Sequence, residues 1–437
     1  MSAEADVIVV GLGAMGSSVC LALARRGARV IGIDRHLPPH PWGSTHGETR
    51  ITRLGIGEGP EYVPLAQRSH ELWRELEAEA SVRLFYPVGL LVLGHPQSRF
   101  LAQTRASASQ YGIEHEDLSN SELRVRYPMF SLDELTEAYS EPGAGYVRPE
   151  EAVAAQLALA RRHGARLLLG EAVDRWEAGT ELVRVHTRSG SRTAQQLVLC
   201  PGAWIGELFP EGRELFAVFR QQLYWWPIRR GYELLRAMPA FVWDLAGDQS
   251  GYVHLDGFYG FPAIDGPAGG MKVATEVYDE TAVPDGRQHP PAAEQVRAMS
   301  EGCIAARLPW LGTEPLRSAS CLYTSTIGNR FVIDRHPLHS RVLVVSACSG
   351  HGFKHSPAIG EAVAEWALDG RPSLDLSPFS LARAARRASD AAGLSDPPSG
   401  ASDAPGLSDP PSRASDAAGL SHPPRRASDA PRAVSDP

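Results

Sequence analysis

Three glycines near the start of the chain have the spacing of a dinucleotide-binding turn. Gly11, Gly13 and Gly16 follow the β-branched run Val7 to Val10 and precede an apolar, Ala-rich helix pattern. A tight turn at Gly11 and a close backbone approach at Gly13 would bring a diphosphate to the helix N-terminus, where free N–H groups stabilise it. Gly16 would let helix and strand pack closely. The spacing alone is weak evidence, because Gly-rich turns are common in α/β proteins.

The residues after this turn complete the pattern. The helix runs to about Arg26, Gly27 stands where a helix C-cap belongs, and a second strand over 29–33 leads into Asp34. A carboxylate roughly 20 residues beyond the glycines is placed to bind ribose hydroxyls. Together these features predict a βαβ unit that binds a dinucleotide. The pattern does not distinguish NAD from FAD.

The segment that follows Asp34 is predicted to be a long loop, because its prolines exclude regular structure. Small and polar residues at 43–47 suit backbone contacts with a ligand, and Arg50 and Arg53 come directly behind them. Loops held by a rigid scaffold often carry function. Two arginines beside a nucleotide-binding loop favour a functional role over solvated surface charges.

A second strand, glycine turn and helix lie far along the chain. Residues 341–346 have the pattern of a strand, SGHGFK at 349–354 forms the turn, and residues 357–368 have the pattern of a helix. Such a turn can place a second set of helix N–H groups at the same ligand.

Between these two units lies a segment, 219–262, that is rich in aromatic side chains and alternates as strands do: Tyr224, Trp225, Trp226, Trp243, Tyr252, Phe258, Tyr259 and Phe261. These rings either line a pocket or form core, and the sequence favours neither. Lys272 follows in a predicted strand, 271–274. Taken alone, its pattern favours a solubilising lysine at a strand edge.

Length and composition restrict the class of protein. A chain of 437 residues with 43% hydrophobic residues predicts two domains with a packed core. The net charge of −8, without a long basic run, does not indicate nucleic-acid binding. No apolar run approaches the roughly 20 residues of a membrane span, and no secretion signal is expected. The five cysteines lack the C-x-x-C spacing of a metal site and predict thiols in the cytoplasm.

The last part of the chain is repetitive. Copies that begin at Ala388, Ala401 and Ala414 consist mainly of Ala, Ser, Asp and Pro. Such a composition buries too little apolar surface to offset the entropy of ordering. Residues 381–437 are therefore predicted to form a disordered repeat tail.

Seven motifs in order carry a resemblance to a known family. They are VIVVGLGAMGSS at the N-terminus, GSTHGETRITR, PGAW, YGFP, the Lys272 strand, CLYT, and FVIDRHP with SGHGFK. From about Asp6 to about Pro378 the chain resembles the monomeric sarcosine oxidase and N-methyltryptophan oxidase group of FAD-dependent amine oxidases.

This resemblance implies an α/β (α+β) fold with two interleaved domains. One is a glutathione-reductase-type FAD-binding domain, made of residues 1–84, 148–216 and 320–380. The other is a substrate domain with a mixed sheet, made of residues 85–147 and 217–319.

The resemblance also implies roles for single residues. Gly11, Gly13, Gly16 and Asp34 would hold the ADP half of FAD, and Cys321 would bond covalently to the flavin 8α-methyl group. Further cofactor contacts are implied for Ala14, Met15, Arg35, Ser44, Thr45, Arg50, Val173, Gly202, Trp204, Gly350, His351, Gly352 and Lys354. No metal site is implied.

On the substrate side, the resemblance implies that Arg53 and Lys354 bind a carboxylate and that Lys272, near Arg50, activates O₂. Tyr259 and Tyr323 would contact the substrate. Paired cations suit a buried carboxylate, and a fixed ammonium stabilises the charge that develops on O₂.

One position departs from the family pattern. Relatives that act on sarcosine or N-methyltryptophan carry a histidine four residues after the oxygen-activating lysine, whereas Glu276 stands here. Alternation along a strand lets Lys272 and Glu276 share a face. Glu276 then either contacts the substrate, which changes the amine that is tolerated, or pairs with Lys272. Both interpretations stay open.

The resemblance thus implies an FAD-dependent oxidase of a secondary amino acid, N-methyl or cyclic, that forms an imine and H₂O₂. The expected partners are a small-molecule amine and O₂, with the protein a monomer. Two alternatives are a flavin dehydrogenase that uses another electron acceptor and a non-catalytic nucleotide-binding or interaction protein. Lys272 argues against the first alternative.

Overall fold

The computed structural model describes residues 3–245, 257–285 and 289–394. Its first sheet has a parallel centre, in which β1 (Ala5–Val10) lies between β2 (Val30–Asp34) and β12 (Gly190–Leu199). The parallel strands β9 (Arg166–Leu169) and β19 (Val342–Ser346) extend it, and three antiparallel strands complete it: β10 (Val173–Ala178), β11 (Val183–Thr187) and β18 (Val332–Arg335). The predicted first βαβ unit and the second strand and turn thus share one sheet.

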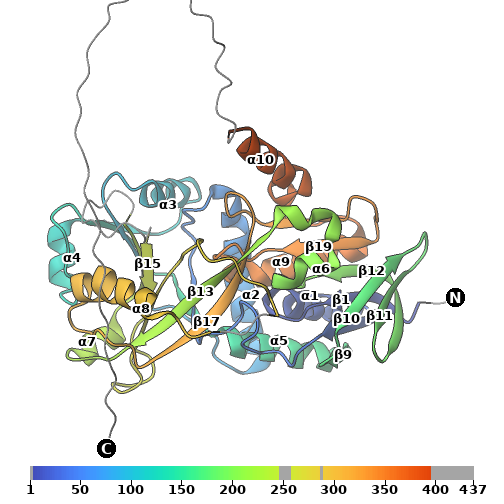
Figure 1. Cartoon of the computed structure of the whole chain (residues 1–437), viewed down its shortest axis with the longest axis horizontal. Coiled ribbons are helices and arrows are strands. Elements are labelled where there is room, and N and C mark those ends of the chain that lie inside the picture. The colour runs from blue at the N-terminus through green and yellow to red at the C-terminus, as the bar shows by residue number, and fades with distance from the viewer. Residues whose placement is uncertain (1–2, 246–256, 286–288, 395–437) are drawn as a thin grey trace, which may run out of the picture. The chain divides into compact units, whose positions relative to one another are not determined.

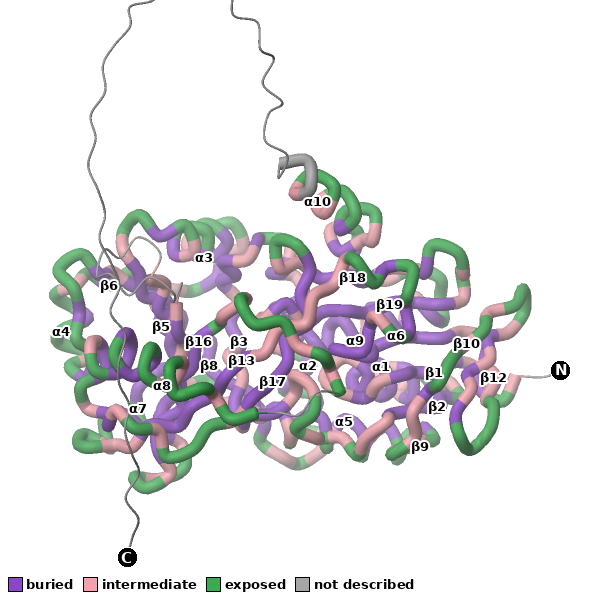
Figure 2. The backbone as a smooth tube through the Cα atoms, in the orientation of Figure 1, coloured by how far each residue is buried: buried purple, intermediate pink, exposed green. Residues whose placement is uncertain are grey.

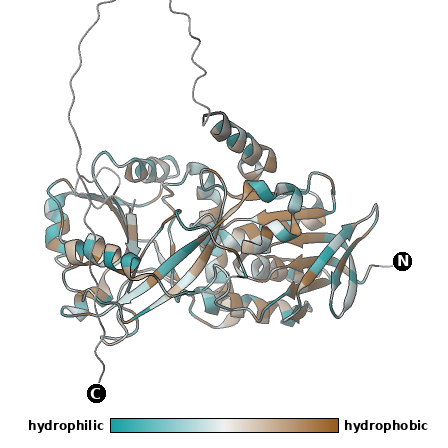
Figure 3. Cartoon of the chain, in the orientation of Figure 1, coloured by the Kyte–Doolittle hydropathy of each residue, from teal (hydrophilic) through white to brown (hydrophobic). Residues whose placement is uncertain are grey.

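Helices cover this sheet because its central strands are apolar on both faces, as Figure 3 shows. The helix α1 (Ala14–Arg25) packs against α5 (Pro149–Arg162) and α9 (Ser356–Asp369), and α2 (Val63–Ala80) packs against α9 (Figure 1). The Ser17 hydroxyl donates to Gln156 Oε1 at 2.7 Å and fixes α1 against α5. The turn before α1 is thereby held at the end of β1.

The second sheet is mixed. Its strands β14 (Ala240–Asp244) and β5 (Leu90–Gly94) run parallel to each other, and its other neighbouring strands pair antiparallel. The remaining strands are β6 (Glu116–Leu118), β7 (Glu137–Glu141), β13 (Ala217–Trp226), β15 (Gly257–Gly260), β16 (Met271–Thr275) and β17 (Arg317–Ser325). The helices around it are α3 (Arg99–Gln110), α4 (Asn120–Arg126), α7 (Tyr232–Ala237) and α8 (Ala293–Met299) (Figure 1). Figure 2 shows that β16 is buried.

Short elements connect the two sheets. A three-stranded sheet consists of β3 (Arg50–Thr52), β4 (Phe85–Tyr86) and β8 (Gly145–Val147). The helix α6 (Ile205–Leu208) and five 3₁₀ turns, at 60–62, 202–204, 210–215, 353–355 and 377–379, lie in the connections of the described segments. The helix α8 continues as a π-helical turn over Ser300–Ala305.

The predicted fold class, mixed α/β with two main sheets, is confirmed. The exact division into the two predicted domains stays a prediction, since the described residues up to Gly393 form one compact unit. Residues 320–325, predicted to belong to the FAD-binding domain, lie in β17, which pairs with β13 in the second sheet.

The start of the predicted disordered tail, at residue 381, is helical in the structure. Residues 381–394 form α10 (Leu381–Leu394), and the Leu381 N–H donates to Asp334 Oδ2 at 2.9 Å. The later repeats and Tyr252 lie outside the described residues. Among the residues that are described, no helix combines the length and apolarity needed to cross a membrane.

Candidate active site

A cavity of about 490 Å³ joins the two sheets. Its walls come from the turn between β1 and α1, the loop after β2, strands of the second sheet and the turn before α9. Every predicted site residue lines it except Gly16, Lys272 and Cys321. The two glycine turns, far apart in sequence, therefore face one cavity.

The first turn is built for close backbone approach. Gly11 has a φ of +84°, and a Cβ there would lie 2.3 Å from the carbonyl oxygen of Cys200. A Cβ at Gly16 would lie 1.7 Å from the carbonyl oxygen of Gly11, so only glycine fits at either position. Gly13 begins α1 without a side-chain cap. The N-terminus of α1, at Gly13, Ala14 and Met15, thus faces the cavity.

Asp34 holds this turn together. Its carboxylate accepts hydrogen bonds from the Leu12 N–H at 2.7 Å and the His36 N–H at 2.8 Å. Arg35, the next residue, forms ion pairs with Glu207 at 3.1 Å and Asp285 at 3.0 Å, and its guanidinium lies over the Trp204 ring. Val173 and Gly202 line the same end of the cavity.

The second turn is equally tight. A Cβ at Gly352 would lie 1.6 Å from the carbonyl oxygen of Ala347, and Gly350 has a φ of +78°. Between them, His351 Nε2 lies 3.1 Å from the carbonyl oxygen of Asn329. Burial lowers the pKa of His351 to about 4. At neutral pH its ring is therefore uncharged.

Arg53 and Lys354 meet at a third charged residue, Glu58, that the sequence analysis missed. Arg53 donates to Glu58 Oε2 at 2.7 Å, and Lys354 Nζ lies 3.7 Å from Glu58 Oε1. Burial acts to raise the pKa of Glu58, but the two cations hold it well below its usual range. Burial lowers the pKa of Lys354 to about 8, against the effect of Glu58. The loop around Glu58 has no periodicity that could have revealed this partner.

Lys272 lies behind the cavity wall. It is 4% exposed on β16, which is paired on both sides, so a solubilising lysine at a strand edge is excluded. Its Nζ donates to the Gly47 carbonyl at 2.6 Å and the Thr49 carbonyl at 3.1 Å. Burial and the neighbouring Arg50 lower its pKa well below the usual range. Arg50 in turn donates to the Ser44 carbonyl at 2.7 Å.

Cys321 is fully buried and shares a cluster with Tyr323 and Ala274. Burial raises the pKa of its thiol to about 11, while Arg50 and Lys272 act in the opposite direction. These two cations are therefore its nearest source of positive charge.

Composition holds a signal for the two lysines that the sequence analysis did not use. The chain contains 43 Lys and Arg residues, of which only Lys272 and Lys354 are lysines. Every other basic position carries arginine. A lysine presents a compact ammonium where arginine would present a planar guanidinium.

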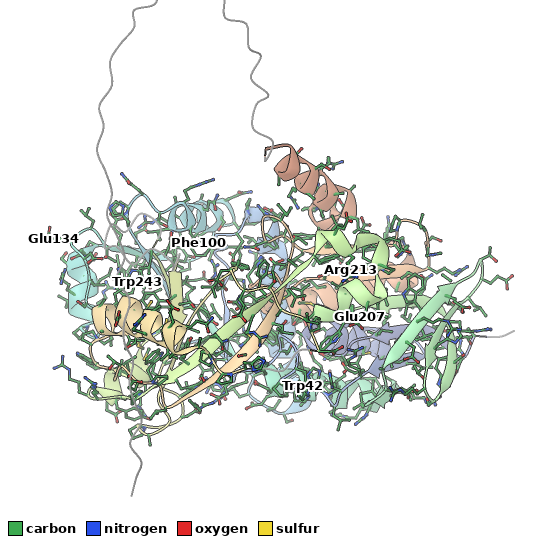
Figure 4. All side chains as sticks on the ribbon, viewed as in Figure 1. Trp42, Phe100, Glu134, Glu207, Arg213 and Trp243 are labelled. Carbon is green, nitrogen blue, oxygen red and sulfur yellow. The ribbon has the colours of Figure 1, made fainter. Side chains whose placement is uncertain are left out.

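Some of the aromatic residues of segment 219–262 line the cavity, and others form core. Trp243, Phe258, Tyr259 and Phe261 line the cavity together with Phe100, and Figure 4 labels Phe100 on α3 and Trp243 on β14. Tyr224 and Trp226 belong to the core of the second sheet. Among the described residues, no three His, Cys, Asp or Glu side chains are placed to hold a metal ion.

Comparison with known proteins gives consistent results. The family model of FAD dependent oxidoreductases matches residues 6–366. The monomeric sarcosine oxidase of Streptomyces avermitilis is 40% identical over 389 residues, which cover 88% of this chain and 99% of that protein. The N-methyl-L-tryptophan oxidase of Salmonella heidelberg is 32% identical over 393 residues, 86% of this chain and 98% of that protein.

A solved structure shares the fold. NikD, described as an unusual amino acid oxidase essential for nikkomycin biosynthesis, matches in its open form with a TM-score of 0.75 and 23% identity. The match covers 87% of this chain and 98% of that chain.

Proposed function

The chain belongs to the FAD-dependent oxidoreductase family, and on that premise we propose that it oxidises a secondary amino acid, N-methyl or cyclic, with O₂ as electron acceptor. The substrate loses a hydride from a carbon next to its nitrogen and a proton from the nitrogen itself and becomes an imine, and O₂ takes up the two electrons and two protons to become H₂O₂. FAD, when bound, supplies the hydride acceptor. One observation carries the proposal: a single cavity joins the dinucleotide-binding turn to the Arg53 and Lys354 pair.

The residues present fit FAD. The N-terminus of α1, where the N-cap residue Gly13 has no side chain, suits the diphosphate, and Asp34 at the end of β2 suits a ribose. We assign the remaining contacts to two groups. Arg35, Val173, Gly202 and Trp204 line the adenosine end, and Ser44, Thr45, Arg50, Gly350, His351 and Gly352 line the flavin end.

Arg53 and Lys354 would bind the α-carboxylate of the substrate, because they are the paired cations of the cavity wall. Tyr259 and Tyr323 would lie against its carbon chain. Burial raises the pKa of both phenols, so these walls stay uncharged at neutral pH. Lys272, with Arg50, would stabilise the negative charge that O₂ gains.

The test is a screen of N-methyl and cyclic amino acids against the yellow holoprotein. We expect at least one to bleach the flavin under nitrogen and to yield H₂O₂ in air. Bleaching without H₂O₂ would indicate a dehydrogenase that uses another acceptor. A protein that no amine bleaches would contradict the proposal.

We also propose that Cys321 bonds covalently to the flavin. Acid precipitation of the wild type should leave the colour and one flavin mass on the protein, whereas C321S should release all of its flavin. C348S is the matched control, since Cys348 lines the cavity beside Ser44 and should be dispensable for the bond. Complete release from wild type, or release from C348S instead of C321S, would contradict this assignment.

We extend the proposal to a monomer in the cytoplasm. None of the five cysteines forms a disulfide bond, which suits a reducing compartment.

A further inference from the structure

Glu276 places a carboxylate in the cavity without a protein partner. The strand β16 ends at Thr275, and the Glu276 side chain that follows lines the cavity and is exposed to it. Within the described part of the chain, it makes no hydrogen bond and no ion pair. A carboxylate that faces a cavity without a protein partner is placed to bind a ligand group, and a positively charged group is its natural complement.

The surroundings of Glu276 place it at the reaction site. A Cβ at Gly350 would lie 3.3 Å from Glu276 Oε1, 2.7 Å from Tyr278 Oη and 3.2 Å from Tyr323 Cε2. Glu276 therefore stands over the second glycine turn, on the wall shared with Tyr323.

The charged neighbours of Glu276 are the carboxylate-binding residues and not Lys272. Lys354, Arg53 and Glu58 are the charges that affect its ionisation. Lys272 is held by the Gly47 and Thr49 carbonyls instead. Of the two interpretations left open by the sequence, pairing with Lys272 is thus not observed.

The charges around the cavity match an amino acid in its zwitterionic form. Arg53 and Lys354 carry two positive charges, and Glu58 compensates one of them. A substrate carboxylate compensates the other, which leaves Glu276 for the substrate ammonium. We propose that Glu276 binds the protonated amine of the substrate, so that the site selects zwitterions over simple carboxylates. This inference rests on the proposed function.

Two isosteric ligands isolate this charge. Betaine and 3,3-dimethylbutanoate share a carboxylate and a shape, but only betaine carries a positive charge, and without a nitrogen lone pair it cannot be oxidised. Calorimetric titration of the holoprotein at about pH 8 should show that betaine binds at least roughly tenfold more tightly than 3,3-dimethylbutanoate. In E276Q the two affinities should become nearly equal. E280Q is the matched control, because Glu280 lies on the same segment but pairs with Arg220.

The preference should also depend on pH. Burial raises the pKa of Glu276 to about 7, so the wild-type preference should fall between about pH 8 and about pH 6 as the carboxylate is protonated. Tyr259, Tyr278, Tyr323 and Cys321 also face Glu276, but burial raises their pKa values and keeps them neutral. Glu58 stays ionised because its pKa is low. Lys354 and Arg53 act on the carboxylate that both ligands share. Their effects therefore cancel in the ratio of the betaine affinity to the 3,3-dimethylbutanoate affinity.

The outcomes separate this inference from the proposed function. Equal or undetectable binding of the two ligands by wild type, or a preference that survives in E276Q, would overturn the role of Glu276. Neither result depends on turnover. The amine screen alone decides whether the protein is an oxidase.

Discussion

Replacing Lys272 with methionine is expected to slow the reaction of the reduced protein with O₂ by about 10²- to 10³-fold, the scale of one lost donor at a charge-developing site. Reduction of the flavin by substrate should change little, because Lys272 lies behind the cavity wall and does not line it. Methionine keeps the length of the side chain and removes only the amine. Separate anaerobic reduction and reoxidation traces in a stopped-flow instrument measure the two steps.

The contacts of Lys272 favour its charged form despite burial. Its Nζ reaches three acceptors, the Gly47 and Thr49 carbonyls and, at 3.3 Å, Thr49 Oγ1, which matches the three donors of an ammonium. The Phe261 ring lies 4.9 Å away and adds a cation–π contact. The charge is thus held in place before O₂ arrives, and no reorganisation is needed.

This charge should be lost as the pH rises. Burial and Arg50 lower the pKa of Lys272, so the ammonium is present below that lowered pKa and is lost as the pH rises through it. The reoxidation rate of wild type should therefore fall with rising pH. The reoxidation rate of K272M should not show this fall. Unchanged reoxidation in K272M at every pH would remove Lys272 from the oxygen reaction.

Local sequence patterns predicted the parts of the site that depend on backbone geometry. The glycine spacing at Gly11 to Gly16 predicted the β1–α1 turn, since positive φ and close packing admit only glycine there. SGHGFK predicted the second turn by the same logic, and the sheet places both at one cavity.

Contacts made through space were not predictable from one sequence. Glu58 contacts Arg53 and Lys354 from a loop without regular spacing, so no sequence pattern predicts these contacts. The alternation that relates Lys272 to Glu276 holds only within a strand, and β16 ends at Thr275, one residue too early. The motif CLYT does not reveal which sheet holds Cys321, because the pairing of β17 with β13 decides that.

Replacing Arg53 with alanine is expected to weaken amino-acid binding by about 2–4 kcal/mol, the cost of removing one partner from a buried charge pair. In the wild type, two cations share the carboxylate of Glu58, which leaves one positive charge for the ligand. In R53A, Glu58 would compensate Lys354 alone, and no positive charge would remain for a substrate carboxylate. The loss should therefore exceed that of one hydrogen bond.

A comparison of ligands with and without the carboxylate tests this cause. Sarcosine and dimethylamine differ only by the carboxymethyl and methyl groups on the same nitrogen, so R53A should weaken sarcosine far more than dimethylamine. E58Q provides the opposite change, because it removes the internal competitor and keeps both cations. Carboxylate binding should be retained or strengthened in E58Q. If R53A weakened both ligands equally, Arg53 would act through the shape of the cavity, and the paired-cation role would fail.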